Sequence, residues 1–258
     1  MYKRPRIIPC LLLQNQGLVK TIKFSNPKYL GDPINAVKIY NEIGVDELCL
    51  IDITATKENK EPDFQMLSSI ATEAFMPLSY GGGITNLEQI RKLFYIGFEK
   101  IILNTALIRN PELVKEASKH AGSQSIVASI DVKTEFLGKQ YCYICDGNEK
   151  IKINPIELAK KAESLGAGEI LLNSMNCDGM MQGYDVELVK QVSNSVNIPV
   201  IACGGAGNIS DIKQVLYNGS ADAAAAGSMF VYFGKKKAVL INFPSEQEFL
   251  EAGVYVNE

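Results

Sequence analysis

Three aspartates follow runs of apolar residues, where a carboxylate could transfer protons. Asp131 ends the run IVASID, Asp52 ends LCLID, and Asp178 lies shortly beyond the run ILLNS. A carboxylate that is partly desolvated at the end of a buried strand can act as a general acid or base. We interpret Asp131 as catalytic, because an aspartate directly after buried apolar residues is otherwise costly. Asp52 is better explained as the cap of a loop, and Asp178 fits either role.

Two glycine-rich turns have the composition of anion-binding loops. The first turn is YGGGITN, and the second is CGGAGNIS. Each follows an apolar run, and each precedes residues that typically start a helix, such as Asn86 and Asn208. Glycine permits positive φ and a close approach of the backbone, so consecutive N–H groups can converge on an anion at a helix N-terminus. One such turn is equally well explained as a tight turn, but two are stronger evidence.

Four charged residues stand at the opposite ends of apolar runs. Arg6, Glu47, Lys100 and Glu169 each open such a run. Two of each sign could form a paired ring, or each side chain could simply be solvated. The residues alone leave both interpretations open.

The elements that must position these residues follow a regular order. Short apolar runs alternate with amphipathic helical stretches, and strands separated by helices pair in parallel. Eight such strands can close into a barrel, so the sequence predicts an α/β fold, a (β/α)8 TIM barrel. The predicted strands are residues 6–13, 47–53, 77–80, 100–104, 126–132, 169–173, 199–203 and 222–226, and the predicted helices include residues 33–43 and 111–120.

The second half of the chain repeats the first. IGVDELCLIDI matches LGAGEILLNSM, and MPLSYGGGITNLEQI matches IPVIACGGAGNISDI. Glu47 and Glu169 are as far apart in the sequence as Asn86 and Asn208, so the offset is constant. A repeat of nearly half the chain is too long for a solenoid unit. It predicts two repeated (β/α)4 half-barrels, and the lack of a linker-like segment predicts one domain over residues 1–258.

The repeat also predicts two phosphate cradles at one end of the barrel. Loops after strands 7 and 8 usually bind phosphate in this fold, and the repeat places a second cradle after strands 3 and 4. Two cradles across one mouth imply an elongated ligand with a phosphate at each end. The first cradle comprises Gly82, Gly83, Asn104 and Thr105, and the second cradle comprises Gly204, Gly205, Gly227 and Ser228.

Composition restricts the class of protein. The chain has 258 residues, of which 47% are hydrophobic, and a formal net charge of -3. This charge predicts neither nucleic-acid nor membrane binding. The apolar run after the basic N-terminus is short and is followed by Gln14 and Asn15, so we expect a buried strand, no secretory leader and a cytoplasmic protein.

The residues that commonly hold metals predict no metal site. Six cysteines are scattered, and the single CxxC pair, Cys142 and Cys145, lacks two further ligands. The sole histidine, His120, lies near the end of a predicted helix, so it is not a candidate for catalysis. We expect no cofactor.

The ordered motifs resemble those of the cyclase subunit of imidazole glycerol phosphate synthase. They are RIIPCLLL, DELCLIDITA, YGGGI, ILNTALI, VASIDVK, GAGEILLNS, DGMMQGYD and ACGGAGN, and they extend over nearly the whole chain. The resemblance implies that a glutaminase subunit docks on the barrel floor and that ammonia passes through the barrel. A diphosphorylated aminoimidazole precursor then binds at the mouth.

The resemblance also assigns roles to particular residues. It makes Arg6, Glu47, Lys100 and Glu169 the ammonia gate, and it favours the paired ring. It adds Asp178 and Gly179 to the phosphate-binding residues. It also makes Lys20, on the mobile first loop, a second catalytic residue beside Asp131.

The chain departs from the family at two positions of the mouth. The strand-1 aspartate of the family falls on Leu12, and the threonine after strand 6 falls on Asn173. Leucine cannot transfer a proton, and losing one of two proton-transfer groups costs about 100- to 10,000-fold in rate. We therefore expect cyclase activity to be weak or altered.

This pattern resembles a paralogous branch linked to surface-sugar biosynthesis. In that branch, the barrel and its glutaminase supply ammonia to a separate sugar amidotransferase. Three alternatives stay open: the ordinary cyclase/lyase of histidine biosynthesis, the related sugar isomerase of that pathway, and a docking scaffold without catalysis. Leu12 counts against the first two alternatives, and ligand binding at the mouth would count against the third.

Overall fold

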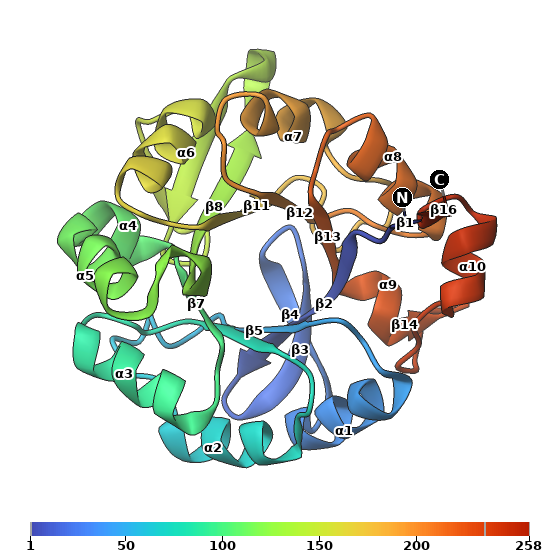
Figure 1. Cartoon of the computed structure of the whole chain (residues 1–258), viewed down its shortest axis with the longest axis horizontal. Helices are drawn as coiled ribbons and strands as arrows, with labels where there is room; N and C mark the ends of the chain where they lie inside the picture. Colours follow the sequence, from blue (N-terminus) through green and yellow to red (C-terminus); the bar gives the residue numbers. More distant parts are fainter. Residues whose placement is uncertain (1, 235, 258) are drawn as a thin grey trace.

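A closed parallel barrel forms the centre of the molecule in this computed structural model, which describes residues 2–234 and 236–257 (Figure 1). The eight strands pair in the order β2-β5-β6-β7-β8-β11-β12-β13, and β13 pairs with β2 to close the barrel. The prediction of a (β/α)8 barrel is confirmed. The barrel strands are β2 (Arg6–Gln14), β5 (Leu48–Asp52), β6 (Leu78–Gly81), β7 (Lys100–Leu103), β8 (Ile126–Thr134), β11 (Glu169–Ser174), β12 (Val200–Cys203) and β13 (Ala223–Ala226).

Helices surround the barrel and return the chain to the next strand (Figure 1). They are α1 (Pro33–Ile43), α2 (Phe64–Glu73), α3 (Leu87–Ile96), α4 (Thr105–Arg109), α5 (Pro111–Ala121), α6 (Pro155–Ser164), α7 (Val186–Ser193), α8 (Ile209–Tyr217), α9 (Ser228–Val231) and α10 (Glu246–Glu251), with 3-10 turns at Ser123–Ser125 and Phe136–Gly138.

Local sequence signals account for the helix ends. In α1 the Asp32 side chain accepts a hydrogen bond from the Asn35 N–H, Pro33 occupies the first turn, and Gly44 ends the helix with φ +79°. Asn86 and Asn208 cap α3 and α8 in the same way, which fixes the helices that follow the two glycine turns.

The core has two separate layers. One lies between the strands and the helices, and it includes the buried rings of Tyr40, Tyr80 and Phe230. The other fills the inside of the barrel and consists of Ile8, Cys10, Cys49, Ile102, Val127, Leu171, Ile201, Cys203, Ala223 and Ala225. Because side chains alternate along a strand, every barrel strand except β6 contributes apolar side chains to both layers, and β6 places Ser79 inside the barrel.

Two hairpins extend the barrel at its mouth. The first consists of β3 (Gly17–Ile22) and β4 (Ser25–Gly31), and the second of β9 (Gln140–Ile144) and β10 (Glu149–Ile151). Lys20 was expected on a mobile loop. The structure places Lys20 instead on the strand β3, which pairs with both β2 and β4. The hairpin tips meet, since a Cβ on Gly147 would lie 2.9 Å from the Phe24 ring.

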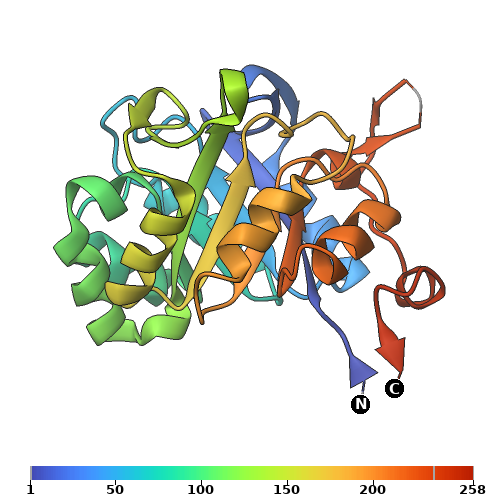
Figure 2. The same ribbon diagram turned by 90° about the horizontal axis from the view of Figure 1, so that it is seen from above.

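The two ends of the barrel differ in shape. Figure 2 shows the hairpins at the end opposite the chain termini, where the short strands β1 (Tyr2–Lys3) and β16 (Val256–Asn257) pair. A further pair, β14 (Tyr232–Phe233) and β15 (Ala238–Val239), follows α9. Within residues 2–234 and 236–257, no helix is long and apolar enough to cross a membrane.

Candidate functional site

A pocket opens at the mouth of the barrel, and the space in and above it, open solvent included, amounts to about 1170 Å³. It is lined by the carboxyl ends of the strands and by the first hairpin. The structure brings all of the mouth residues predicted from the sequence into this lining, namely Lys20, Gly82, Gly83, Asn104, Thr105, Asp131, Asp178, Gly179, Gly204, Gly205, Gly227 and Ser228.

Asp131 is a buried carboxyl group in this pocket. Only 7% of the residue is exposed, and no described residue donates a hydrogen bond to its carboxylate. Burial raises its pKa to about 8, and the nearby charges of Asp146 and Asp178 act in the same direction. A carboxyl group with such a pKa exchanges protons near neutral pH, as a general acid or base requires.

Lys20 reaches the same pocket from the first hairpin. The residue is buried, and its Nζ lies 3.4 Å from the carbonyl oxygen of Cys10. A Cβ on Gly227 would lie 1.8 Å from this Nζ, so the absence of a side chain there makes room for the lysine. Lys20 therefore places a positive charge beside the second cradle.

The end of β2 carries no ionisable group. Leu12 lines the pocket, and it pairs with Ile51 of β5 and Val19 of β3. The neighbouring residues Leu11 and Leu13 are buried. Proton transfer from this strand end is therefore absent, whereas Asp131 stands at the matching end of β8.

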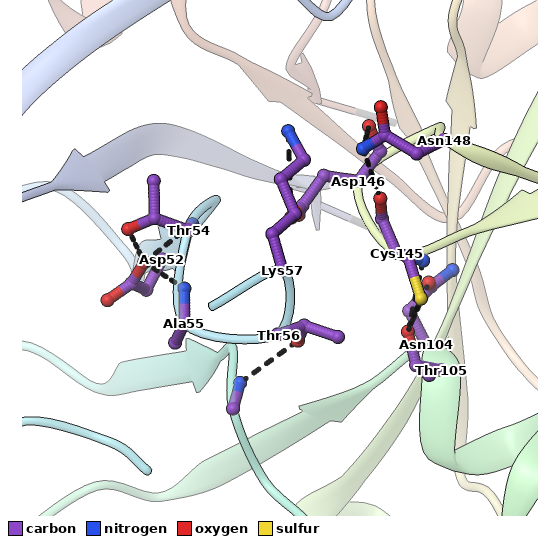
Figure 3. A network of polar contacts seen from close by, with 11 residues as sticks. Asp52, Thr54, Ala55, Thr56, Lys57, Asn104, Thr105, Cys145, Asp146 and Asn148 are labelled. Atoms are coloured by element: carbon purple, nitrogen blue, oxygen red, sulfur yellow. Dashed lines mark hydrogen bonds and ion pairs between the residues drawn. The ribbon is translucent and has the colours of Figure 1, made fainter. Parts of the chain in front are cut away.

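Three polar groups of the first cradle already have partners within the protein. Gly83, at φ +68°, donates its N–H to Thr56 Oγ1 at 3.2 Å. Asn104 Nδ2 donates to the Ser129 carbonyl at 3.0 Å. Thr105 Oγ1 accepts from the Cys145 N–H at 3.1 Å, which ties the second hairpin to the cradle (Figure 3).

Asp178 lines the pocket together with the second cradle. Its Oδ2 accepts from Thr21 Oγ1 at 2.9 Å and from the Phe24 N–H at 3.3 Å, so Asp178 anchors the first hairpin. Gly205, at φ +122°, passes close to Gly183, and a Cβ there would lie 2.0 Å from the Gly183 carbonyl oxygen. Only glycine fits this turn.

The Ser228 hydroxyl differs from that of Thr105. The residue is buried at the start of α9, and its hydroxyl forms no hydrogen bond to another described residue. It lines the pocket, so this hydroxyl is available to a ligand.

The floor of the barrel holds a ring of alternating charges, which we call the floor ring. Arg6 Nη1 lies 2.6 Å from Glu47 Oε2, and Arg6 Nη2 lies 2.7 Å from Glu169 Oε1. Lys100 Nζ lies 2.9 Å from Oε2 of each glutamate. The four side chains thus form a closed circuit, with both glutamates buried.

A small internal cavity lies between the floor ring and the mouth. Its lining includes Glu47 of the floor ring together with Cys49, Val127 and Ala225. Ile102 lines both this cavity and the mouth pocket. The apolar side chain of Ile102 therefore lies between the two spaces.

Comparison with known proteins gives a consistent result. The histidine biosynthesis protein family matches residues 6–237. The chain belongs to this family. A Pseudomonas aeruginosa relative, provisionally named imidazole glycerol phosphate synthase subunit hisF2, is 47% identical over 241 residues, which cover 93% of this chain and 96% of that protein.

Two further relatives of the family cover most of the chain. A Leptospira interrogans protein, provisionally named imidazole glycerol phosphate synthase subunit HisF, is 48% identical over 246 residues, 95% of this chain and 97% of that protein. Imidazole glycerol phosphate synthase subunit HisF of Alkaliphilus metalliredigens is 40% identical over 227 residues, 88% of this chain and 90% of that protein.

Asp52 has the capping role expected from the sequence. Its Oδ1 accepts from the Thr54 N–H at 2.8 Å, from Thr54 Oγ1 at 2.8 Å and from the Ala55 N–H at 3.0 Å. These bonds fix the loop after β5. Asp52 therefore shapes the pocket wall.

Two charged residues that line the pocket, Lys57 and Asp146, were not predicted from the sequence. Lys57 lies on the loop after β5, and Asp146 lies on the turn between β9 and β10. The sequence CDGN is typical of a tight turn and gave no sign that its aspartate faces the mouth. No group of three or more His, Cys, Asp or Glu among the described residues is arranged to hold a metal ion.

Proposed function

We propose that this barrel accepts ammonia from a glutaminase at its floor and works in a glutamine-dependent amidotransferase complex. Its fold and its family support this proposal, because the relatives carry the name of a subunit of imidazole glycerol phosphate synthase. The floor ring is the gate, the barrel interior is the conduit, and the mouth pocket is where ammonia meets its acceptor.

The observation that carries this proposal is that the floor ring, the internal cavity and the mouth pocket follow one another along the barrel axis. Glu47 belongs to the floor ring and also lines the internal cavity, while Ile102 lines the internal cavity and also the mouth pocket. Ile102 and the other inner side chains of the barrel are apolar, so this path suits neutral ammonia better than ammonium, because an unpaired charge is costly to bury. Opening the floor ring would admit ammonia to this path.

At the mouth we propose a ligand with two phosphates, one at each cradle. Asp131 transfers protons, and Lys20 contributes positive charge beside the second cradle. Because Leu12 replaces the second proton-transfer group, we propose that cyclisation is slow. Ammonia then serves mainly a separate enzyme that amidates a surface sugar.

One experiment separates this proposal from the ordinary enzyme of histidine biosynthesis. The purified chain is given ammonium and the diphosphorylated aminoimidazole precursor, and the formation of imidazole glycerol phosphate is followed at steady state. We expect turnover about 100-fold or more below that of an ordinary cyclase subunit assayed in parallel. Turnover equal to the ordinary subunit, or rescue of a histidine auxotroph, would select the second function. The 40% identical Alkaliphilus metalliredigens relative favours this second candidate.

Glutaminase docking is tested at the exposed aromatic residues of the floor. Phe75 and Tyr95 are 88% and 92% exposed, and each follows or ends a helix on the floor side. We expect Phe75→Glu and Tyr95→Glu to weaken binding of the glutaminase from the same genome. Phe136→Glu is the matched control, because Phe136 is 88% exposed but lies on the mouth side. Equal effects of all three changes would contradict floor docking.

A further inference from the structure

Two charged side chains meet beside the first cradle without forming a close pair. Lys57 Nζ lies 3.9 Å from Asp146 Oδ2, and both residues line the mouth pocket with Gly83 and Thr105. Figure 3 shows the pair between the loop after β5 and the turn after β9. The distance is about 1 Å longer than an ordinary charged hydrogen bond. The lysine is therefore held only loosely.

The Asp146 carboxylate is poorly satisfied. Its Oδ2 is buried and accepts no hydrogen bond, and the side chain is only 17% exposed. Burial raises the pKa of Asp146 to about 7, although Lys57 acts in the opposite direction. The residue also adopts φ +53°. The turn that holds it is fixed by the bond from the Cys145 N–H to Thr105.

A phosphate in the first cradle would lie near this carboxylate and would be repelled by it. Among the described residues that line the pocket, the positive charges are Lys20 and Lys57. Lys20 lies beside Gly227 of the second cradle, so Lys57 is the cation on the side of the first cradle. Its side chain is 38% exposed and has room to move.

We propose that Lys57 binds the phosphate of a ligand at the first cradle and that Asp146 is its counter-ion while the cradle is empty. Binding exchanges one anionic partner of Lys57 for another, and the Asp146 carboxylate competes with the incoming phosphate. The pair thereby sets how tightly this end of the pocket holds phosphate. This inference rests on the proposed two-phosphate ligand.

The test compares variants by calorimetric titration with fructose 1,6-bisphosphate, a small probe with a phosphate at each end. We expect Lys57→Met to weaken binding about tenfold, because one charged hydrogen bond is lost. We expect Asp146→Asn to tighten binding about fivefold, because a repelling charge is removed. Asparagine tolerates positive φ well, so this variant keeps the turn.

The matched control is Lys60→Met. Lys60 lies on the same loop, pairs with Glu58 and does not line the pocket, so the affinity should not change. A Lys57→Met variant that binds the probe like the wild type overturns the proposal, and so does an Asp146→Asn variant that binds more weakly. If wild-type protein fails to bind the probe at all, the two-phosphate ligand itself is wrong, and this inference falls with it.

Discussion

The two halves of the mouth share a backbone plan but carry different side chains. Gly82 and Gly83 have positive φ in the first half, as do Gly204 and Gly205 in the second. The strand ends differ, with a leucine on β2 and an aspartate on β8. A repeated half-barrel thus keeps the geometry that presents backbone N–H groups, while each half has its own ionisable groups.

The two hairpins above the mouth also differ, in the contacts that hold each of them to the barrel. The first hairpin is anchored by two hydrogen bonds to the buried Asp178 carboxylate. The second pairs through β9 with β8, and its turn is tied down by the Cys145 bond to Thr105, by the Arg109–Glu149 ion pair and by the loose ion pair of Lys57 and Asp146. Because hydrogen bonds to a buried carboxylate are among the stronger ones, we expect the first hairpin to be the more rigid. The following predictions test whether these differences matter.

The largest expected effect comes from making the two strand ends alike. Leu12→Asp places a second carboxyl group in the pocket, opposite Asp131. We expect ammonium-dependent turnover of the aminoimidazole precursor to rise by about 100- to 10,000-fold, which is the usual contribution of one proton-transfer group. Leu12→Asn is the control, since it is polar and of similar size but cannot ionise. Equal gains in both variants would show that polarity, not proton transfer, is responsible.

The second prediction concerns the cost of burying Asp131. The unfolded carboxyl group ionises near pH 4, whereas burial raises the pKa of the folded one to about 8. Between these values the folded state keeps a proton that the unfolded state has released. Stability therefore falls as pH rises through this window, by an amount on the order of a few kcal/mol.

Asp131→Asn should abolish this fall, because asparagine has no proton to lose. Urea unfolding at pH 5 and pH 8.5 measures the difference between the two proteins. Asp32→Asn is the control, since asparagine also caps a helix and Asp32 is exposed. If the difference in unfolding free energy between wild type and Asp131→Asn is the same at pH 5 and pH 8.5, the pKa of Asp131 is not raised.

Most of the barrel could be predicted from the sequence, because its signals are local and repeated. Strands β8 and β11 were expected to within two residues at each end, and α1 to the residue, since Asp32, Pro33 and Gly44 mark its ends. The hairpins were missed. Their turns contain non-glycine residues at positive φ, such as Lys23 and Cys145. The residue types alone do not predict this conformation.

The candidate site was only partly predictable for a related reason. Strand order brings the carboxyl ends of all parallel strands to one edge, so Asp131 and the glycine turns could be placed together. Whether a polar group is free or already bonded depends on contacts between distant loops. The bond from Cys145 to Thr105, and the approach of Lys57 to Asp146, join segments that no local pattern connects.

The third prediction compares the two cradles directly. The Ser228 hydroxyl is buried, lines the pocket and has no described partner, so we propose that it bonds to a phosphate. Ser228→Ala should weaken binding of fructose 1,6-bisphosphate about tenfold, because a charged acceptor loses its donor. The free energy of unfolding without ligand should stay within about 0.5 kcal/mol of the wild type. Unchanged affinity would remove Ser228 from the site.

The smallest expected effect is on the corresponding hydroxyl of the first cradle. Thr105 Oγ1 already accepts from the Cys145 N–H, so it stabilises the second hairpin before any ligand binds. Thr105→Ala should lower the free energy of unfolding by about 1 kcal/mol, since it leaves a partly buried N–H without its acceptor. Urea unfolding measures this change, and faster hydrogen exchange at Cys145 locates it.

Thr105→Ser is the matched control for this last comparison, because it keeps the hydroxyl and loses only a methyl group. We expect it to restore slow exchange at Cys145, while Ser228→Ala leaves that exchange unchanged. If Thr105→Ala and Ser228→Ala affect stability equally, the two hydroxyls have the same structural role. The difference between the cradles would then lie only in the charges of Lys57, Asp146 and Lys20, and not in how each half holds its hairpin.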